Sequence, residues 1–252
     1  MTVSDLELKT IQPVTGLADF VENFWMIRNH SNAEKEIVIL PDGRFDVIFT
    51  CSGDEPFHAT LKGLDTEPGQ VVIPAHLVMF AVSFKLLAIE YLLDVKMACV
   101  LNVGQRLPEG FWGISEHDLN DFEVFCQQVS KILHGQIKPG IDGRKQKLFG
   151  LIYSSNGSLT VQELANRVGW GSRQINRYFN QQFGISLKAY CNILRFRASL
   201  PQIRDGRLFP EQNFTDQTHF IKEIKKFSGV VPKELSKNQN DRFILLSVLP
   251  KK

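Results

Sequence analysis

The sequence predicts an α+β protein in which a small antiparallel β-sheet or barrel, with helices at its C-terminal end, precedes an all-α part. Short β-branched and aromatic runs alternate with turn residues over positions 36–84. A helical spacing of apolar residues begins at Asp118. Capped helices then follow a segment rich in glycine and proline. The 252 residues, 43% hydrophobic and 22% charged, are typical of a globular protein and exclude a largely disordered chain.

The predicted strands are separated by turns of recognisable chemistry. Between the first two lie Pro41, which fixes the backbone angle φ, Asp42, which can bond its own backbone, and Gly43, which tolerates a positive φ. This combination predicts a β-hairpin. The runs predicted as strands are Glu36–Leu40, Phe45–Thr50, Phe57–Leu61, Gln70–Ile73 and Val78–Phe84.

An amphipathic helix is predicted after the strands, because apolar residues recur there at steps of three and four. The stripe packs either against the protein's own sheet, which we favour, or against a second copy in a homodimer. Its members are Leu119, Phe122, Phe125, Cys126, Val129, Ile132 and Leu133.

Residues 134–143 contain three glycines and a proline and form the best candidate linker. We therefore predict a β-rich domain for sensing or dimerisation over residues 1–134 and a linker over residues 135–143. A helical domain with a C-terminal tail is predicted over residues 144–252.

The composition indicates a cytoplasmic protein. The most apolar region, Leu77–Leu93, is interrupted by Lys85 and Glu90, so no membrane span is predicted. The first 14 residues carry charges where a signal peptide needs an apolar stretch. Four cysteines stand far apart without a CxxC pair, as expected for reduced thiols. Six histidines form no HxH or HExxH motif, so we expect no metal and no other cofactor.

The net charge of +2 hides a strong asymmetry. Residues 151–252 contain 16 Lys and Arg and 7 Asp and Glu, whereas residues 1–150 contain 13 basic and 20 acidic residues. Such a division is expected when only the basic part meets a polyanion. The alternative is a chance distribution of surface charge.

A helix-turn-helix is predicted next. Thr160 and Glu163 form a capping box for its first helix. Ser172 is expected to cap the second helix. The small Ala165 permits close approach of the two helices, and Gly169 permits the tight turn between them.

The outer face of that second helix has the chemistry of base recognition. Arginine can bind guanine, and asparagine or glutamine can bind adenine, through paired hydrogen bonds. No acidic residue occurs from position 172 to position 190, so nothing there repels phosphates. The alternative is an ordinary solvated face. The residues predicted to bind DNA are Arg173, Gln174, Asn176, Arg177 and Asn180.

A second capped helix opens near Asp216. Its apolar residues Phe220, Ile224 and Phe227 are expected to be buried. Its outward residues are Gln217, Thr218, Ile221, Lys222 and Lys225.

Two motifs in the helical part resemble those of a known family. The run Ser186-Leu187-Lys188-x-Tyr190, and the run Asp216–Glu223 followed by Phe227-Ser228-Gly229-x-x-Pro232, are similar to the DNA-binding domain of AraC-type transcriptional regulators. The resemblance covers roughly residues 146–235. The turn Leu40–Gly43 with Asp46-x-x-Phe49 also resembles the sensor domain of one branch of these regulators.

The resemblance implies two helix-turn-helix units that are joined by a rigid linker helix and enter successive major grooves of double-stranded DNA. Their recognition positions are expected at Arg173, Asn176 and Arg177, and at Gln217, Thr218 and Lys222. Lys225 is a further expected DNA contact.

The sequence departs from the family pattern in two places. Only residues 205–212 separate the linker helix from Asn213, and this span, which includes Pro210, is too short for a supporting helix. We therefore predict a reduced second unit. Pro201 lies inside the linker helix, roughly Ser186–Ile203, and is expected to kink it or end it early.

Two further features have more than one interpretation. Phe24, Trp25, His76 and Phe84 line either a pocket or, as we favour, the core. The apolar tail Phe243–Leu249 is expected to pack onto the helical domain as a strand.

We therefore expect a sequence-specific DNA-binding transcription regulator rather than an enzyme. Its front domain is expected to sense a small-molecule effector or to form a homodimer. One alternative is a single helix-turn-helix binder whose second unit is a protein-interaction surface. Another is a cupin-like metal-dependent enzyme with a basic accessory domain, against which the missing HxH motif argues.

Overall fold

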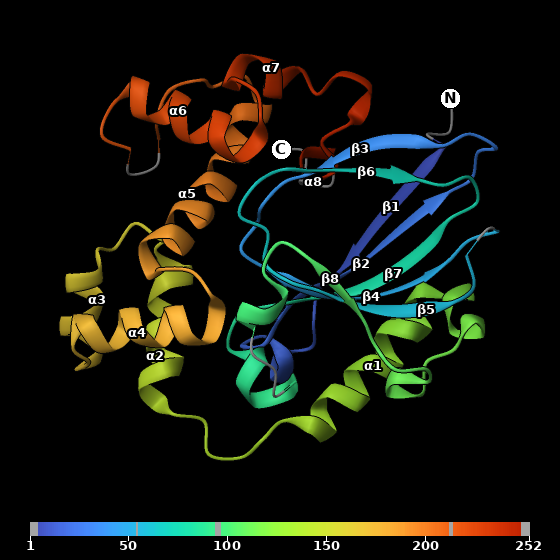
Figure 1. Ribbon diagram of the computed structural model, residues 1–252, viewed down its shortest axis with the longest axis horizontal. Helices are drawn as coiled ribbons and strands as arrows, with labels where there is room; N and C mark the ends of the chain where they lie inside the picture. The colour runs from blue at the N-terminus through green and yellow to red at the C-terminus, as the bar shows by residue number, and fades with distance from the viewer. Residues whose placement is uncertain (1–4, 54, 94–96, 212–213, 248–252) are drawn as a thin grey trace.

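The computed structural model describes residues 5–53, 55–93, 97–211 and 214–247. Two antiparallel sheets occupy the first half, and helices make up the second half (Figure 1). We call residues 5–136 the front part and residues 137–247 the helical part. The predicted α+β class is confirmed.

The larger sheet has six strands and the smaller sheet has two. The large sheet has the order β1 (Leu6–Ile11), β2 (Val21–Asn29), β7 (Val78–Phe84), β4 (Phe45–Cys51), β5 (His58–Lys62) and β8 (Gly104–Arg106). The small sheet pairs β3 (Lys35–Ile39) with β6 (Gly69–Ile73). All five predicted runs are strands, whereas β1, β2 and β8 were not predicted.

The predicted hairpin at Pro41–Arg44 is wrong. The local turn chemistry is present, since the Asp42 carboxylate accepts the Arg44 amide at 2.9 Å and Gly43 has a φ of +74°. However, β3 pairs with β6, and β4 pairs with β5 and β7. The turn therefore carries the chain from one sheet to the other instead of folding it back.

The amphipathic helix α1 (Phe122–Gln136) lies along the large sheet (Figure 1). The Phe125 ring lies 5.6 Å from that of Phe49 and 5.3 Å from that of Phe80, in edge-on contacts. The stripe of α1 is thus buried against the protein's own sheet, as we favoured, and it is not free to form a dimer surface. Short helical turns complete the front part: η1 (Thr15–Leu17), η2 (Ile89–Leu93), η3 (Met97–Val100), η4 (Phe111–Gly113) and η5 (Glu116–Asn120).

The aromatic residues singled out in the front part do not come together in one pocket. Phe24 and Phe84 are fully buried, which confirms the core interpretation for both. Trp25 lines a cavity. His76 is exposed and is hydrogen-bonded to Asn32 at 2.8 Å.

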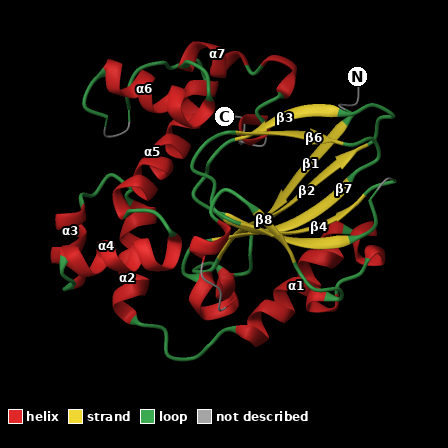
Figure 2. Ribbon diagram, in the orientation of Figure 1, coloured by secondary structure: helices red, strands yellow, loops and turns green. Residues whose placement is uncertain are grey.

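The helical part is arranged around one long helix, α5, which runs between two groups of shorter helices (Figure 2). Its elements are α2 (Gly143–Ser154), α3 (Val161–Val168), α4 (Ser172–Phe183), α5 (Leu187–Arg204), α6 (Gln217–Ser228), α7 (Pro232–Lys237), η6 (Gln239–Asp241) and α8 (Ile244–Ser247).

Pro201 does not end α5, which continues to Arg204. Proline has no amide N–H, so the Arg197 carbonyl loses the hydrogen bond that residue 201 would donate. Beyond it, the Asp205 amide still donates to the Pro201 carbonyl at 3.1 Å. The helix therefore loses one bond close to its end.

The C-terminal tail packs differently from the prediction. Phe243 forms a parallel bridge with Val38 of β3, and the following residues form the short helix α8 rather than a strand. Ile244 is buried with Ile27 and Ile37 between the two sheets. The tail therefore completes the core of the front part; Val248 and Leu249 lie outside the described residues.

The turn at Gly43 also contacts α5. A Cβ atom at Gly43 would lie 2.8 Å from Leu194 Cδ2 and 3.2 Å from Tyr190 Cε2. Glycine is thus required here both by the positive φ and by the close approach of the linker helix.

We expect Gly43→Ala to lower the free energy of unfolding by about 1–2 kcal/mol through backbone strain and by about 1–3 kcal/mol more through overpacking against α5. Gly140→Ala is the matched control, because Gly140 has a φ of +78° and no neighbour within 4 Å of an added Cβ. Chemical denaturation of both variants measures the difference. Equal losses would contradict the close packing at Gly43.

Candidate nucleic-acid interface

The first helix-turn-helix has the predicted framework. The Thr160 hydroxyl accepts the Glu163 amide at 3.2 Å, and the Glu163 carboxylate accepts the Thr160 amide at 2.8 Å. Ala165 is buried where α3 and α4 meet, and Gly169 ends α3 with a φ of +67°. The capping box and the turn are both confirmed.

The predicted cap of α4 is wrong by one residue. Gly171 occupies the N-cap position, and Ser172 is the first helical residue. The Ser172 hydroxyl donates to Gln162 Oε1 at 3.1 Å, and the Gln174 side-chain oxygen accepts the Gly171 amide at 3.0 Å. Gln174 therefore serves as a local cap, which leaves only its NH₂ group free to bind DNA.

The outer face of α4 is polar and basic, as predicted. Ile175 and Phe179 are buried on the opposite face, whereas Arg173, Arg177 and Asn180 are exposed. Asn176 is half-buried. The side chains of Arg173, Asn176, Arg177 and Asn180 make no hydrogen bond or ion pair with the described part of the chain. Their donors are thus free for a ligand.

The second candidate face lies on α6. Asp216 caps this helix by accepting the His219 amide at 2.8 Å, and Phe220 and Ile224 are buried. The predicted outward residues are all exposed: Gln217, Thr218, Ile221, Lys222 and Lys225. This face therefore presents two ammonium groups.

The second unit is reduced, as predicted. Between α5 and α6 the described residues contain turns and bends but no helix, with Gln212 and Asn213 outside the described residues. Gln202 donates to the Phe209 carbonyl at 2.5 Å, and Gln217 donates to the Leu208 carbonyl at 2.9 Å. Two side-chain amides thus hold the connection in place of a helix.

Helix α4 is also held to the front part, by a contact between Tyr178 and a carboxylate. The Tyr178 hydroxyl donates to Glu90 Oε2 at 3.1 Å, and Lys145 of α2 forms an ion pair with the same carboxylate at 2.8 Å. Burial, together with the negative charge of Glu90, holds the pKa of Tyr178 well above its ordinary value. The tyrosine therefore remains a hydrogen-bond donor.

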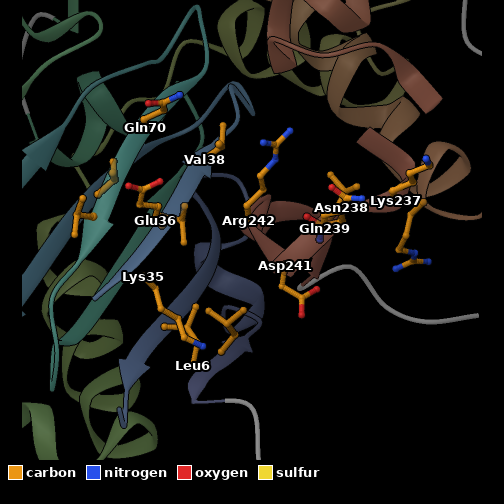
Figure 3. Close-up of a pocket in the computed structure, with 16 residues that line it drawn as sticks. Leu6, Lys35, Glu36, Val38, Gln70, Lys237, Asn238, Gln239, Asp241 and Arg242 are labelled. Atoms are coloured by element: carbon orange, nitrogen blue, oxygen red, sulfur yellow. The ribbon is translucent and has the colours of Figure 1, made fainter. Parts of the chain in front are cut away.

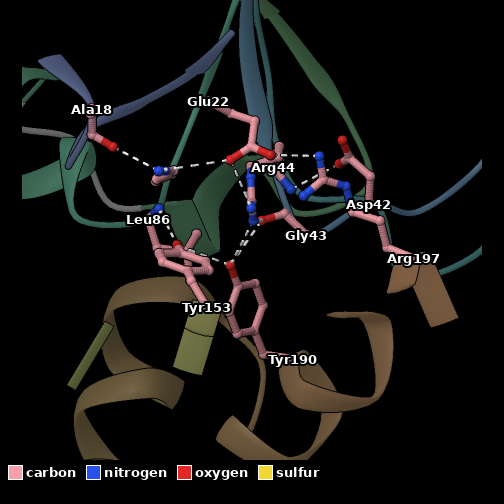
Figure 4. Close-up of polar contacts among 10 residues, drawn as sticks. Ala18, Glu22, Asp42, Gly43, Arg44, Leu86, Tyr153, Tyr190 and Arg197 are labelled. Carbon is pink, nitrogen blue, oxygen red and sulfur yellow. Dashed lines mark hydrogen bonds and ion pairs between the residues drawn. The ribbon is translucent and has the colours of Figure 1, made fainter. Parts of the chain in front are cut away.

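The linker helix α5 is held by a half-buried carboxylate of β2. Figure 4 shows Glu22 between Arg44 and Arg197, to which it is bonded at 3.0 and 2.6 Å. Lys85 lies 3.9 Å from the same carboxylate. Burial by itself would raise the pKa of Glu22, but Arg44 and Arg197 outweigh it and lower this pKa to about 2.

Two tyrosine hydroxyls extend this network. Tyr190 of α5 donates to the Gly43 carbonyl at 2.9 Å and lies 3.1 Å from the Tyr153 hydroxyl (Figure 4). The Arg44 guanidinium lies 4.7 Å from the centre of the Tyr153 ring. We call Glu22, Arg44, Tyr153, Tyr190 and Arg197 the inter-part network.

A wide groove of about 1310 Å³ is lined by β3 and β6 and by the residues at the end of α7 and after it (Figure 3). Lys35 and Glu36 lie on one wall, and Lys237, Asp241 and Arg242 lie on the other. Because both signs of charge are present, this groove lacks the uniform basic character of α4.

In the described part of the chain, no three side chains of His, Cys, Asp or Glu come together in a way that could hold a metal ion. The four cysteines are free. None of the described helices is long and apolar enough to cross a membrane.

Comparison with known proteins gave three results. Residues 9–104 match the model of a family described as a domain of unknown function (DUF6597). A search of the curated proteins found no match. The structure is similar to that of ToxT from Vibrio cholerae, with 12% identity and a TM-score of 0.44 over 92% of this chain and 97% of that one.

A second ToxT structure, with unsaturated fatty acid bound, gives 10% identity and a TM-score of 0.39 over 98% of this chain and 94% of that one. A likeness at this level carries no information about individual residues of this chain.

We expect Glu22→Gln to lower the free energy of unfolding at pH 7 by about 3 kcal/mol, because Arg44 is left buried without its counter-ion. Glu234→Gln is the matched control, since Glu234 is exposed and pairs with Arg242 at the surface. Chemical denaturation at pH 7 compares the two variants. Equal small losses would show that the inter-part network is worth no more than a surface ion pair.

The pH dependence gives an independent measurement. Glu22 has a lower pKa in the folded protein, about 2, than its ordinary 4.5. Its stabilisation is therefore complete above about pH 4.5 and is lost as the pH falls toward 2. Acid titration of stability should show this loss in the wild type and not in Glu22→Gln.

Proposed function

We propose that the protein is a sequence-specific transcription regulator of the AraC type that binds double-stranded DNA with α4 and α6 in successive major grooves. The observation that carries the proposal is the outer face of α4. It presents Arg173, Arg177 and Asn180 to solvent without a protein partner among the described residues, and it contains no carboxylate. Paired donors of this kind recognise base edges, and the absence of acid avoids repulsion from phosphates.

The length of α5 supports two-groove binding. Helix α4 precedes α5 and α6 follows it, so the two recognition faces lie near opposite ends of the same 18-residue helix. Such a helix spans about 27 Å, which is comparable to the ~34 Å between equivalent major-groove positions one turn apart.

The charge distribution supports the same partner. The basic excess of residues 151–252 predicts that the logarithm of the affinity falls linearly with the logarithm of the salt concentration. The slope should be about −0.9 per phosphate neutralised. Fluorescence anisotropy with a labelled duplex measures it; binding that is indifferent to salt would contradict phosphate contact.

We expect Arg177→Ala to weaken binding to the preferred site by about 1–3 kcal/mol and to relax the preference at one base pair, because Arg177 points outward from α4. Lys188→Ala removes the same charge from an exposed position at the start of α5 and should not change sequence preference. Site selection from random DNA compares the two variants. A uniform loss for Arg177→Ala would make that residue a phosphate contact.

The reduced second unit predicts asymmetric specificity. Gln217 is partly used in holding the Leu208 carbonyl, so the α6 face retains fewer free donors than the α4 face. Gln217→Ala with Lys222→Ala should therefore lower DNA affinity by less than Arg173→Ala with Arg177→Ala. Competition binding on the selected site measures both; equal losses would show that the α6 unit is fully supported.

A second candidate role for α6 is a protein-interaction surface. Phe209 is 73% exposed beside the α6 face, and Ile221 on α6 is 36% exposed. Exposed apolar side chains are common at protein contacts. Unchanged DNA affinity in the Gln217 and Lys222 double variant would favour this role.

A further inference from the structure

A small, partly open cavity lies where α5 and α8 of the helical part meet the strands of the front part. Its volume is about 150 Å³. Cavities near this size accept a molecule as large as benzene. Its lining includes Asn23 and Trp25 of β2, Asp42, Asp46 of β4, Arg197 of α5 and Ile244 of α8.

Asp46 contributes a carboxylate without a counter-ion. It accepts the Trp25 indole N–H at 3.2 Å and a hydrogen bond from the Ser83 hydroxyl. No nitrogen of Lys, Arg or His in the described residues lies within 4 Å of it. Burial, and then the neighbouring Asp42, raises the pKa of Asp46 to about 7. A cation that enters the cavity stabilises the ionised form of such an acid.

Asn23 provides a second, independent indication. Its side-chain oxygen is buried and has no hydrogen-bond partner. The residue lies at an irregularity in the pairing of β2 with β7. Buried polar atoms are almost always hydrogen-bonded, so an unpaired acceptor beside a cavity is a position for a donor from a ligand or from an ordered water.

Apart from Asp42, the other charges at the cavity are already paired. Arg44 and Arg197 bind Glu22, Asp65 binds Lys62, and Lys9 binds Glu7. Asp42 accepts the Arg44 amide and lies in the field of both arginines. Asp46 is therefore the carboxylate at this cavity that lacks a cation.

We propose that this cavity binds a small organic cation, namely an ammonium group with a short apolar substituent. Asp46 is the counter-ion, the Asn23 oxygen accepts a further N–H, and the Trp25 ring forms the wall against the cation. Because Arg197 and Ile244 line the same cavity, the ligand contacts both parts of the protein. Through these contacts the ligand would change the affinity for DNA, and only this effect on DNA binding rests on the proposed function.

The test is calorimetric titration of the full-length protein with three ligands of similar size: n-butylammonium, 1-butanol and butyrate. We expect saturable binding of the ammonium, at least tenfold weaker binding of the alcohol, and no binding of the carboxylate. Equal binding of the alcohol would show a merely apolar cavity. Preferred binding of butyrate would show an anion site at Arg44 and Arg197. Absence of ammonium binding would overturn the proposal.

Two variants connect the binding to the cavity. Asp46→Asn keeps an acceptor for Trp25 and should weaken ammonium binding at least tenfold, whereas Glu109→Gln, on the exposed surface, should leave it unchanged. If Asp46→Asn does not fold, Trp25→Phe takes its place. This variant should abolish the ligand-dependent change in tryptophan emission, with Trp112 and Trp170 as the unaffected background. Tight binding by both Asp46→Asn and Trp25→Phe would place the ligand elsewhere.

Ammonium binding should depend on pH in a defined direction. Ammonium pairs with the ionised carboxylate, so binding should tighten as the pH rises from 6 to 8 through the pKa of Asp46. Without ligand, the raised pKa makes the ionised form destabilising, so Asp46→Asn should unfold at a higher temperature than the wild type at pH 8. These measurements use no DNA, so their outcome does not depend on the proposed function. A ligand-dependent change in DNA affinity then tests the coupling through Arg197.

Discussion

The position of both α4 and α6 depends on one half-buried carboxylate. Glu22 of β2 is shared by Arg44 of the front part and Arg197 of the linker helix. A buried charge without a partner is strongly destabilising, so the three groups must remain together. Because α4 and α6 lie at the two ends of α5, this contact sets the placement of both faces relative to the sheets. The hydroxyl of Tyr190 reinforces it through the Gly43 carbonyl.

Much of the fold could be predicted because it is encoded locally. Alternating strands, the Thr160 capping box and the Gly169 turn each depend on a few neighbouring residues. The partner of β3 could not be predicted, because Asp42 and Gly43 determine the shape of a turn and not the sheet that the chain enters next. Glu22 was missed for the same reason, since its partners are distant in sequence.

Of the candidate site, too, only the locally encoded part could be predicted from the sequence. The outer face of α4 was predictable because helical periodicity alone separates Arg173 and Arg177 from the buried Ile175. The support of α6 was not, because it depends on where the Leu208 and Phe209 carbonyls lie. The cap of α4 also escaped prediction, since Gly171 occupies the N-cap position in place of the expected serine and the Gln174 side chain accepts its amide.

Two residues of the inter-part network lie far apart in the sequence, and this separation affects the order in which the protein folds during synthesis. Glu22 and Arg197 are 175 residues apart. At ribosomal rates of roughly 5–20 residues per second, about 10–35 seconds pass between the synthesis of the first and the second. During that interval the sheets can form with Glu22 paired to Arg44 and Lys85 of the front part. The front part therefore reaches its final charge balance only after the linker helix has left the ribosome, so the last step of its folding is also the docking of the helical part.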